Sequence, residues 1–190
     1  MRLGILGGSF DPLHLGHLRA AENAREALGL GQVLFIPAGV PPHKPEATLA
    51  PGSDRFAMVA LGTASHPAFV PSDLELVRAG ASYTVETLQH LHRERPEDEL
   101  FLIVGSDTLP EMSTWREPEK IFALCTVAVA ARPGSPSGPA PAGARVVSVP
   151  GEGLSLSASA VRSLLRQGKS ARYLVPEPVL DFIAKRGLYR

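Results

Sequence analysis

Disulfides and long apolar segments are both missing from this 190-residue sequence. Its one cysteine, Cys125, lies in the apolar run 121–125, so we expect a buried thiol and no internal disulfide, which suits a reducing cytoplasm. No run approaches the roughly 18 apolar residues that a membrane-spanning helix needs. The apolar stretch at the N-terminus is too short for a signal peptide. These absences predict a soluble cytoplasmic protein with no membrane partner.

An excess of charge of one sign is also missing. Nineteen basic residues balance nineteen acidic ones, whereas domains that bind duplexes usually carry a broad basic surface. We therefore expect no nucleic-acid partner, although a local basic pocket for a small anion stays compatible with this balance. The apolar fraction of 44% is sufficient for a sizeable core, and the length fits one compact domain. A homo-oligomer is compatible with the sequence.

Apolar segments alternate with segments of helical spacing along the chain. The sequence predicts strands over 2–6, 32–36, 69–71, 100–104, 126–130 and 145–149. It predicts helices over 15–28, 54–64, 84–93, 107–112, 118–124, 159–167 and 176–186. In the second helix Phe56, Val59 and Ala60 are expected to face inward. Residues 74–76 are expected to be extended, and the Pro- and Gly-rich segment 132–143 is expected to be a surface loop.

Strands that are apolar without strict alternation indicate burial on both faces. Together with the alternation of strands and helices, they predict a doubly wound, mainly parallel α/β sheet with helices on both faces. We expect one domain over 1–190, with a C-terminal helical part from about 155 to 190 packed on it. Ligands of such sheets bind beyond the carboxyl ends of the strands. Residues 7–17, 37–44, 105–107 and the segment after the last strand should therefore meet at one rim.

The first of these loops, GGSFDPLHLGH over residues 7–17, is suited to holding phosphate. Gly7 and Gly8 let a ligand approach the backbone closely, and the helix that follows points its N-terminus at the same place. His14 and His17 are three residues apart and so face one direction, with Gly16 between them. The alternatives are a plain glycine turn with surface or capping histidines, and a metal site. No third ligand with tight spacing accompanies the histidines, so we expect no metal held by the protein.

A second anion-binding pattern, LSASAVR, spans residues 156–162. Ser157 and Ser159 can cap the next helix, and Arg162 offers a forked cation that suits phosphate oxygens. The alternative is an ordinary serine-capped helix with a surface arginine.

Two further residues suit a nucleotide. Asp107, after the strand that ends at Gly105, can accept two hydrogen bonds from a ribose diol, or it can cap a helix. Trp115, the only tryptophan, lies in a polar stretch and could stack on a pyridinium ring or pack against the body of the protein.

Taken together, these segments resemble a known family. GGSFDP followed by HLGH resembles the signature of the nucleotidyltransferase superfamily with the H-x-G-H motif. The segments PPHK (41–44), SYTV (82–85), GSD (105–107) and Trp115 are similar to those of bacterial nicotinate-nucleotide adenylyltransferases. LSASAVR resembles the family's second signature, except that Ala158 stands where a hydroxyl residue is usual. The resemblance covers the chain from Arg2 to its end.

The resemblance implies a Rossmann-like nucleotidyltransferase that transfers the adenylyl group of ATP to nicotinate mononucleotide, giving deamido-NAD and pyrophosphate in NAD biosynthesis. It implies Mg²⁺ bound with ATP and no tightly bound organic cofactor. Its implied catalytic residues are His14, His17 and Arg162. The implied ATP-binding residues are Gly7, Gly8, Ser9, Phe10, His17, Gly105, Asp107, Ser157, Ser159 and Arg162. The implied mononucleotide-binding residues are Ser9, His43, Lys44, Thr84 and Trp115.

Three alternative functions stay open. In phosphopantetheine adenylyltransferases a threonine typically replaces the first histidine of the pair, so His14, the loop 41–44 and Trp115 favour the nicotinate enzyme. Nicotinamide mononucleotide is a closer alternative, because selection between carboxylate and amide depends on backbone donors. A non-catalytic nucleotide sensor is an alternative of another class, which the intact His14, His17 and Arg162 disfavour.

Overall fold

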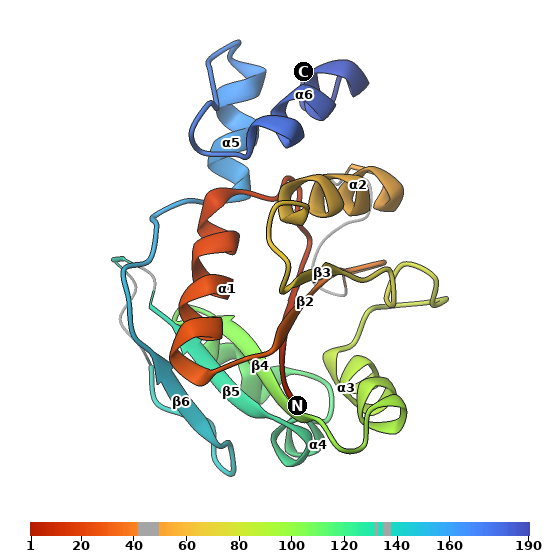
Figure 1. The fold of residues 1–190 in the computed structure, drawn as a ribbon, viewed down its shortest axis with the longest axis vertical. Helices are drawn as coiled ribbons and strands as arrows, with labels where there is room; N and C mark the ends of the chain where they lie inside the picture. The colour runs from red at the N-terminus through yellow and green to blue at the C-terminus, as the bar shows by residue number, and fades with distance from the viewer. Residues whose placement is uncertain (42–49, 132, 135–137) are drawn as a thin grey trace.

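A computed structural model describes residues 1–41, 50–131, 133–134 and 138–190. Within these residues six parallel strands form one sheet in the order β3-β2-β1-β4-β5-β6 (Figure 1). The strands are β1 (Arg2–Gly8), β2 (Gln32–Pro37), β3 (Phe69–Pro71), β4 (Glu99–Gly105), β5 (Thr126–Ala130) and β6 (Val146–Val149). The strand order reverses between β1 and β4, as in doubly wound α/β folds. The predicted fold class is therefore confirmed.

Helices cover both faces of this sheet (Figure 1). They are α1 (Leu15–Leu28), α2 (Gly52–Thr63), α3 (Thr84–Glu94), α4 (Pro118–Leu124), α5 (Ala158–Arg166) and α6 (Glu177–Arg186), with the short 3₁₀ helix η2 (Leu109–Thr114). Along β2, Val33 and Phe35 pack with α1 and α2, whereas Leu34 and Ile36 pack with α3 and α4. Both sides of the strand are thus buried, which explains why its sequence is continuously apolar.

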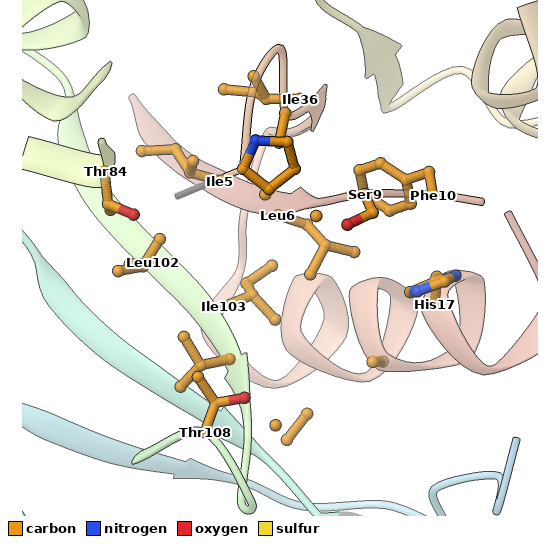
Figure 2. A pocket seen from close by; sticks show the side chains of 18 of the residues that line it. Ile5, Leu6, Ser9, Phe10, His17, Ile36, Thr84, Leu102, Ile103 and Thr108 are labelled. Carbon is orange, nitrogen blue, oxygen red and sulfur yellow. The ribbon is translucent and has the colours of Figure 1, made fainter. Parts of the chain in front are cut away.

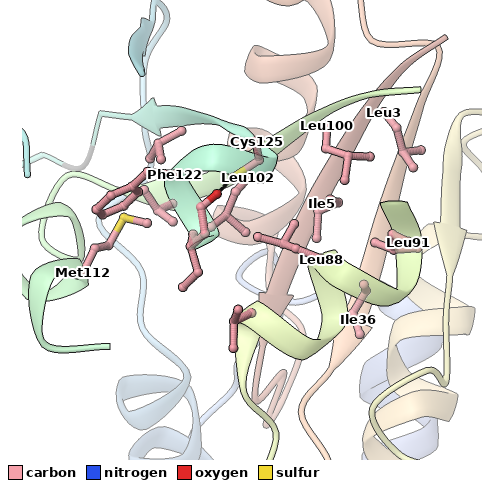
Figure 3. Packing of buried hydrophobic residues seen from close by; sticks show 14 of the residues in the cluster. Leu3, Ile5, Ile36, Leu88, Leu91, Leu100, Leu102, Met112, Phe122 and Cys125 are labelled. Carbon is pink, nitrogen blue, oxygen red and sulfur yellow. Dashed lines mark hydrogen bonds between the residues drawn. The ribbon is translucent and has the colours of Figure 1, made fainter. Parts of the chain in front are cut away.

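The core between the sheet and α3 is tightly packed by leucines (Figure 3). Leu88 and Leu91 of α3 are buried, as their helical spacing predicts. Cys125 is 1% exposed in the same cluster, and its thiol donates to the Ile121 carbonyl at 3.3 Å. The prediction of a buried thiol is confirmed. Among the described residues, no helix combines the length and the apolar character that crossing a bilayer requires.

Most predicted elements agree with the structure to within one or two residues, but two local predictions are wrong. Residues 74–76 form a turn instead of an extended segment, because the Leu76 and Val77 amides both donate to the Asp73 carbonyl. The helix predicted over 107–112 begins only at Leu109 and is a 3₁₀ helix. The predicted surface loop 132–143 lies partly outside the described residues.

The inward face of α2 also differs from the prediction. Phe56 and Ala60 are only partly buried, while Asp54, Arg55 and Met58 are buried beside Val59. Hydrophobic spacing could not predict this, because the helix buries two charged residues. They have partners: Asp54 forms an ion pair with Arg186 at 3.0 Å, and the Arg55 guanidinium donates to three main-chain carbonyls.

The C-terminal helices α5 and α6 lie beyond the ends of α1 and α2 (Figure 1). A separate apolar cluster joins them to α2 through Met58, Val161, Val179 and Ile183. The segment between them also contacts α1 directly, because the Leu15 amide donates to the Leu174 carbonyl at 2.9 Å. The C-terminal part is therefore fixed to the start of α1, which is where the predicted phosphate loop ends.

Candidate active site

A cavity of about 1020 Å³ opens at the carboxyl ends of β1 and β4, where the strand order reverses. Small-molecule sites commonly measure roughly 300–1,000 Å³, so this cavity is at the upper end of that range. Figure 2 shows Ser9, Phe10 and His17 on one side of the view and Thr84 on the other. The loops after β1, β2 and β4 and the segment after β6 all contribute lining residues. The described part of the predicted rim is therefore formed as expected, while residues 42–44 lie outside the described residues.

The glycines of the first loop leave the backbone accessible. A Cβ at Gly7 would meet no atom within 4 Å, and Gly7 and Gly8 both line the cavity. Phe10 follows in the left-handed region with φ of 48°, a conformation that costs a non-glycine residue of order 1 kcal/mol. Its ring is 1% exposed and meets the His17 ring edge-on at 5.0 Å between centroids. Phe10 thus braces one of the two motif histidines.

His14 and His17 lie together at the start of α1. Their rings stack with centroids 3.6 Å apart and planes at 18°. The His14 amide donates to Nδ1 of His17 at 3.2 Å, so neutral His17 carries its proton on Nε2 and can donate from there. Gly16 permits this arrangement, because a Cβ there would lie only 3.0 Å from two atoms of the His14 ring.

The second signature begins α5 at the edge of the same cavity. Ser157 is the N-cap residue, and its hydroxyl accepts from the Ala160 amide at 3.2 Å. Ser159 was also expected to cap this helix, but it lies inside the first turn, where its hydroxyl accepts from Nη2 of Arg162 at 3.3 Å. Ala158 is the first helical residue. The arginine side chain is 18% exposed and lines the cavity.

Asp107 lies in the cavity wall just beyond β4. The alternative that Asp107 is the N-cap residue of a helix is wrong, because Thr108 occupies the N-cap position of η2. A Cβ at Gly105 would lie 2.4 Å from Oδ1 of Asp107, so the glycine lets this carboxylate fold back over the end of the strand. That position places the Asp107 carboxylate in the cavity wall at the carboxyl end of β4.

The opposite wall is formed by the start of α3 and by Trp115. Trp115 packs against the apolar cluster of α3 and α4, which was the alternative to a ligand-binding role, and it also lines the cavity. Its stacking on a pyridinium ring stays a prediction. The next residue, Arg116, lies over the Tyr83 ring at 4.5 Å. Tyr83 is the N-cap residue of α3, and Thr84 is its first helical residue. The indole is thereby held next to a helix N-terminus.

Behind this wall lies a buried carboxylate that the sequence did not single out. Glu75 is 8% exposed, lines the cavity and accepts a hydrogen bond from the Thr87 hydroxyl at 2.6 Å. Burial raises the pKa of Glu75, and the hydrogen bond from Thr87 opposes this shift. Ser82 accepts from the Gly39 amide at 2.8 Å, which ties the loop after β2 to the start of α3.

Three polar residues that anchor the first loop were also missed. Asp11 is 1% exposed, Arg55 is 2% exposed, and Tyr189 donates to Asp11 across 178 positions of the chain. Arg55 donates to the carbonyls of Ser9, Gly39 and Ala50. Burial lowers the pKa of its guanidinium. Asp11 belongs to the first motif and could have been found there; nothing in the sequence marks Arg55 or Tyr189.

The structure brings almost all predicted site residues to this one cavity. Its lining includes Gly7, Gly8, Ser9, Phe10, His14, His17, Thr84, Gly105, Asp107, Trp115, Ser157, Ser159 and Arg162. His43 and Lys44 lie outside the described residues. Within the described residues, no three His, Cys, Asp or Glu side chains are grouped as a metal site would require.

Solved structures share this fold. The nicotinic acid mononucleotide adenylyltransferase of Plasmodium falciparum, solved in complex with NaAD, aligns with a TM-score of 0.82 at 18% identity. The alignment covers 99% of this chain and 97% of the other. The same protein in complex with APC aligns with a TM-score of 0.79.

Sequence comparisons agree over the full length. The model of the cytidylyltransferase-like family matches residues 5–167. A protein of Thermus thermophilus named probable nicotinate-nucleotide adenylyltransferase is 46% identical over 190 residues, covering all of both chains. A protein of the same name from Geobacter metallireducens is 44% identical over 212 residues, covering all of this chain and 98% of the other. With this similarity along its whole length, the chain belongs to the nicotinate-nucleotide adenylyltransferase family.

Proposed function

We propose that this protein transfers the adenylyl group of ATP to nicotinate mononucleotide, giving deamido-NAD and pyrophosphate. The observation that carries the proposal is the single cavity in which an anion-binding wall of His14, His17 and Arg162 faces a wall with Trp115 and a helix N-terminus. The full-length similarity to relatives of that name supports the same activity.

ATP is assigned to the wall formed by the first loop and α5. The N-termini of α1 and α5 both reach the cavity there, and helix N-termini favour anions. His17 offers Nε2–H, and Arg162 offers a guanidinium that is only partly exposed. Asp107 at the end of β4 is assigned to the ribose hydroxyls.

The mononucleotide is assigned to the wall with Trp115 and Thr84. A pyridinium ring carries positive charge and is attracted to an indole face. The first N–H groups of α3 have no partners within the helix and lie at the same wall. They favour a carboxylate over a neutral amide, so we expect nicotinate mononucleotide to be preferred over its amide. His43 and Lys44 are assigned to the mononucleotide phosphate on family resemblance alone.

In this reaction the mononucleotide phosphate attacks the α-phosphorus of ATP in line, and pyrophosphate leaves. The attacking group is already an anion, so the protein needs neither a base nor a nucleophile. Catalysis then consists of positioning the two substrates and stabilising the charge that develops on the phosphates. His14, His17 and Arg162 supply hydrogen-bond donors for this charge. Mg²⁺ is assigned as part of the Mg–ATP substrate, since it is commonly held by phosphate oxygens and water.

A pyrophosphate-release assay tests the proposal, using ATP with each of three acceptors. We expect rapid release with nicotinate mononucleotide and much slower release with nicotinamide mononucleotide or phosphopantetheine. Mass spectrometry of the product should show deamido-NAD. A faster reaction with either of the other acceptors would assign the protein to that substrate. ATP binding without release with any acceptor would indicate a nucleotide sensor.

A further inference from the structure

A buried polar cluster joins the first loop to the last residues of the described chain. Oδ1 of Asp11 accepts from the Tyr189 hydroxyl at 2.5 Å and from the Ala50 amide at 3.1 Å. Burial, reinforced by the hydrogen bond to Asp11, raises the pKa of the Tyr189 phenol, so this hydroxyl stays a neutral donor. Asp11 itself is 1% exposed and is deeply enclosed by the loop that also carries the histidines.

The same aspartate supports Arg162. Nη1 of Arg162 donates to the main-chain carbonyl of Asp11 at 2.7 Å and lies 3.6 Å from Oδ2 of Asp11. Among the described residues, Oδ2 has no hydrogen-bond partner, while Oδ1 already has Tyr189 and Ala50. The hydrogen bonds from Tyr189 and Ala50 to Oδ1 therefore fix the carboxylate in the rotation that leaves Oδ2 facing the guanidinium, and the bond from Tyr189 is the shorter of the two.

Tyr189 is itself held firmly. Its ring packs with the apolar cluster of α2, α5 and α6, and its hydroxyl lies 4.0 Å from the sulfur of Met58. The helix before it ends at Gly187 in the left-handed conformation, which turns the chain back towards α2. The position of this tyrosine is thus determined by packing that is independent of Asp11.

We propose that Tyr189 is a positioning residue of the ATP subsite, acting through Asp11 on Arg162. The inference rests on the proposed function, because it takes Arg162 as the group that binds the ATP phosphates. As a positioning residue, Tyr189 does not contact ATP itself. Its hydroxyl orders the carboxylate, and the carboxylate holds the guanidinium in the place where the triphosphate meets it.

The test is Tyr189→Phe, which removes the hydroxyl and keeps the ring. A lost hydrogen bond to a charged group corresponds to an effect of roughly ten- to a hundredfold. Because Tyr189 acts on ATP only through Asp11 and Arg162, we expect the lower end: the Kd for Mg–ATP should rise, and kcat/KM for ATP should fall, about tenfold. The KM for nicotinate mononucleotide should not change. Tyr173→Phe is the matched control, because this tyrosine is in the same C-terminal part but is 82% exposed. Tyr173→Phe should leave the Kd for Mg–ATP, kcat/KM for ATP and the KM for nicotinate mononucleotide unchanged.

The route through Arg162 is tested by combining substitutions. If Tyr189 acts on ATP through this arginine, Tyr189→Phe should have no further effect on the Kd for Mg–ATP in an Arg162→Ala background. Independent, multiplying effects would overturn the proposal. An equal rise in the Kd for Mg–ATP and in the KM for nicotinate mononucleotide would also overturn the proposal, since it would indicate a general structural role.

Direct measurement of ATP binding separates this inference from the proposed function. Wild-type protein that binds Mg–ATP but releases no pyrophosphate would contradict the proposed function, while the Kd values of the variants would still decide the role of Tyr189. If Tyr189→Phe fails to fold, Asp11→Asn replaces it, because the amide keeps an acceptor for Tyr189 but removes the charge facing Arg162. An unchanged Kd for Mg–ATP in that variant would contradict the proposal.

Discussion

The two ends of the cavity are held in place by different forces. At the end that we propose to bind phosphate, called the phosphate end and formed by His14, His17, Ser157 and Arg162, the side chains are fixed by hydrogen bonds and ring stacking. At the ring end, formed by Tyr83, Thr84 and Trp115, contact with the apolar cluster of α3 and α4 fixes the wall. Substitutions at the first end should therefore affect chemistry more than stability, whereas those at the second should affect both.

The largest effect is expected for His17→Ala at the phosphate end. Removing one donor to developing charge should lower kcat by about 10²-fold or more, while the loss of stability should be confined to the ring contacts of His17 with Phe10 and His14. Steady-state kinetics and thermal unfolding measure the two quantities. A change in KM alone would mean that His17 binds substrate and transition state equally.

Trp115→Ala tests the ring end. Loss of the indole face should raise the KM for nicotinate mononucleotide about tenfold, an effect between those of an exposed and a desolvated cation–π contact. It should also lower the midpoint of thermal unfolding, because the ring packs on the apolar cluster. Trp115→Phe keeps part of the aromatic face and serves as the matched variant. An unchanged KM with lower stability would show that Trp115 only packs.

Glu75 behind the ring end should make stability depend on pH. Burial raises the pKa of this carboxyl in the folded protein above its ordinary value of 4.5. The contribution of Glu75 to the free energy of unfolding is therefore fully present below pH 4.5, and it is lost as the pH rises through the pKa of Glu75 in the folded protein. Glu75→Gln cannot titrate, so the decline in unfolding free energy as the pH rises above 4.5 should be shallower. Denaturant titrations at several pH values measure it, and parallel profiles for variant and wild type would contradict the assignment.

The smallest effect is expected at Cys125, deep in the cluster behind the ring end. Burial raises the pKa of this thiol to about 12, so almost no thiolate forms at neutral pH. Thiol reagents should leave native protein unlabelled and should label it stoichiometrically in denaturant. Rapid labelling of the native protein would show that the cluster opens readily and that the ring end is less rigid than its packing implies.

Sequence reasoning was most successful where one physical signal dominates. Buried parallel strands must be apolar on both faces, so the runs 100–104 and 126–130 could be located almost to the residue. The first motif placed two glycines and two histidines between a strand and a helix, and the rule for ligands of doubly wound sheets then indicated the cavity.

The same reasoning failed where distant polar groups are buried together. Arg55 belongs to α2, and its burial depends on three carbonyls from separate loops. Tyr189 meets Asp11 only because α6 packs on α2. Hydrophobic spacing contains no information about such contacts, so the inward face of α2 and the support of Arg162 become visible only in the folded structure.

The first loop contacts α5 through Arg162 and contacts Tyr189, which lies just beyond α6. If nucleotide binds as proposed, bridging His17 and Arg162, it must be released before α5 can separate from the first loop. By mass action, each tenfold excess of ATP over its Kd adds about 1.4 kcal/mol to the free energy of that opening. Amide exchange in α5 and α6 should therefore slow as ATP is added, while exchange in the strands stays limited by global unfolding.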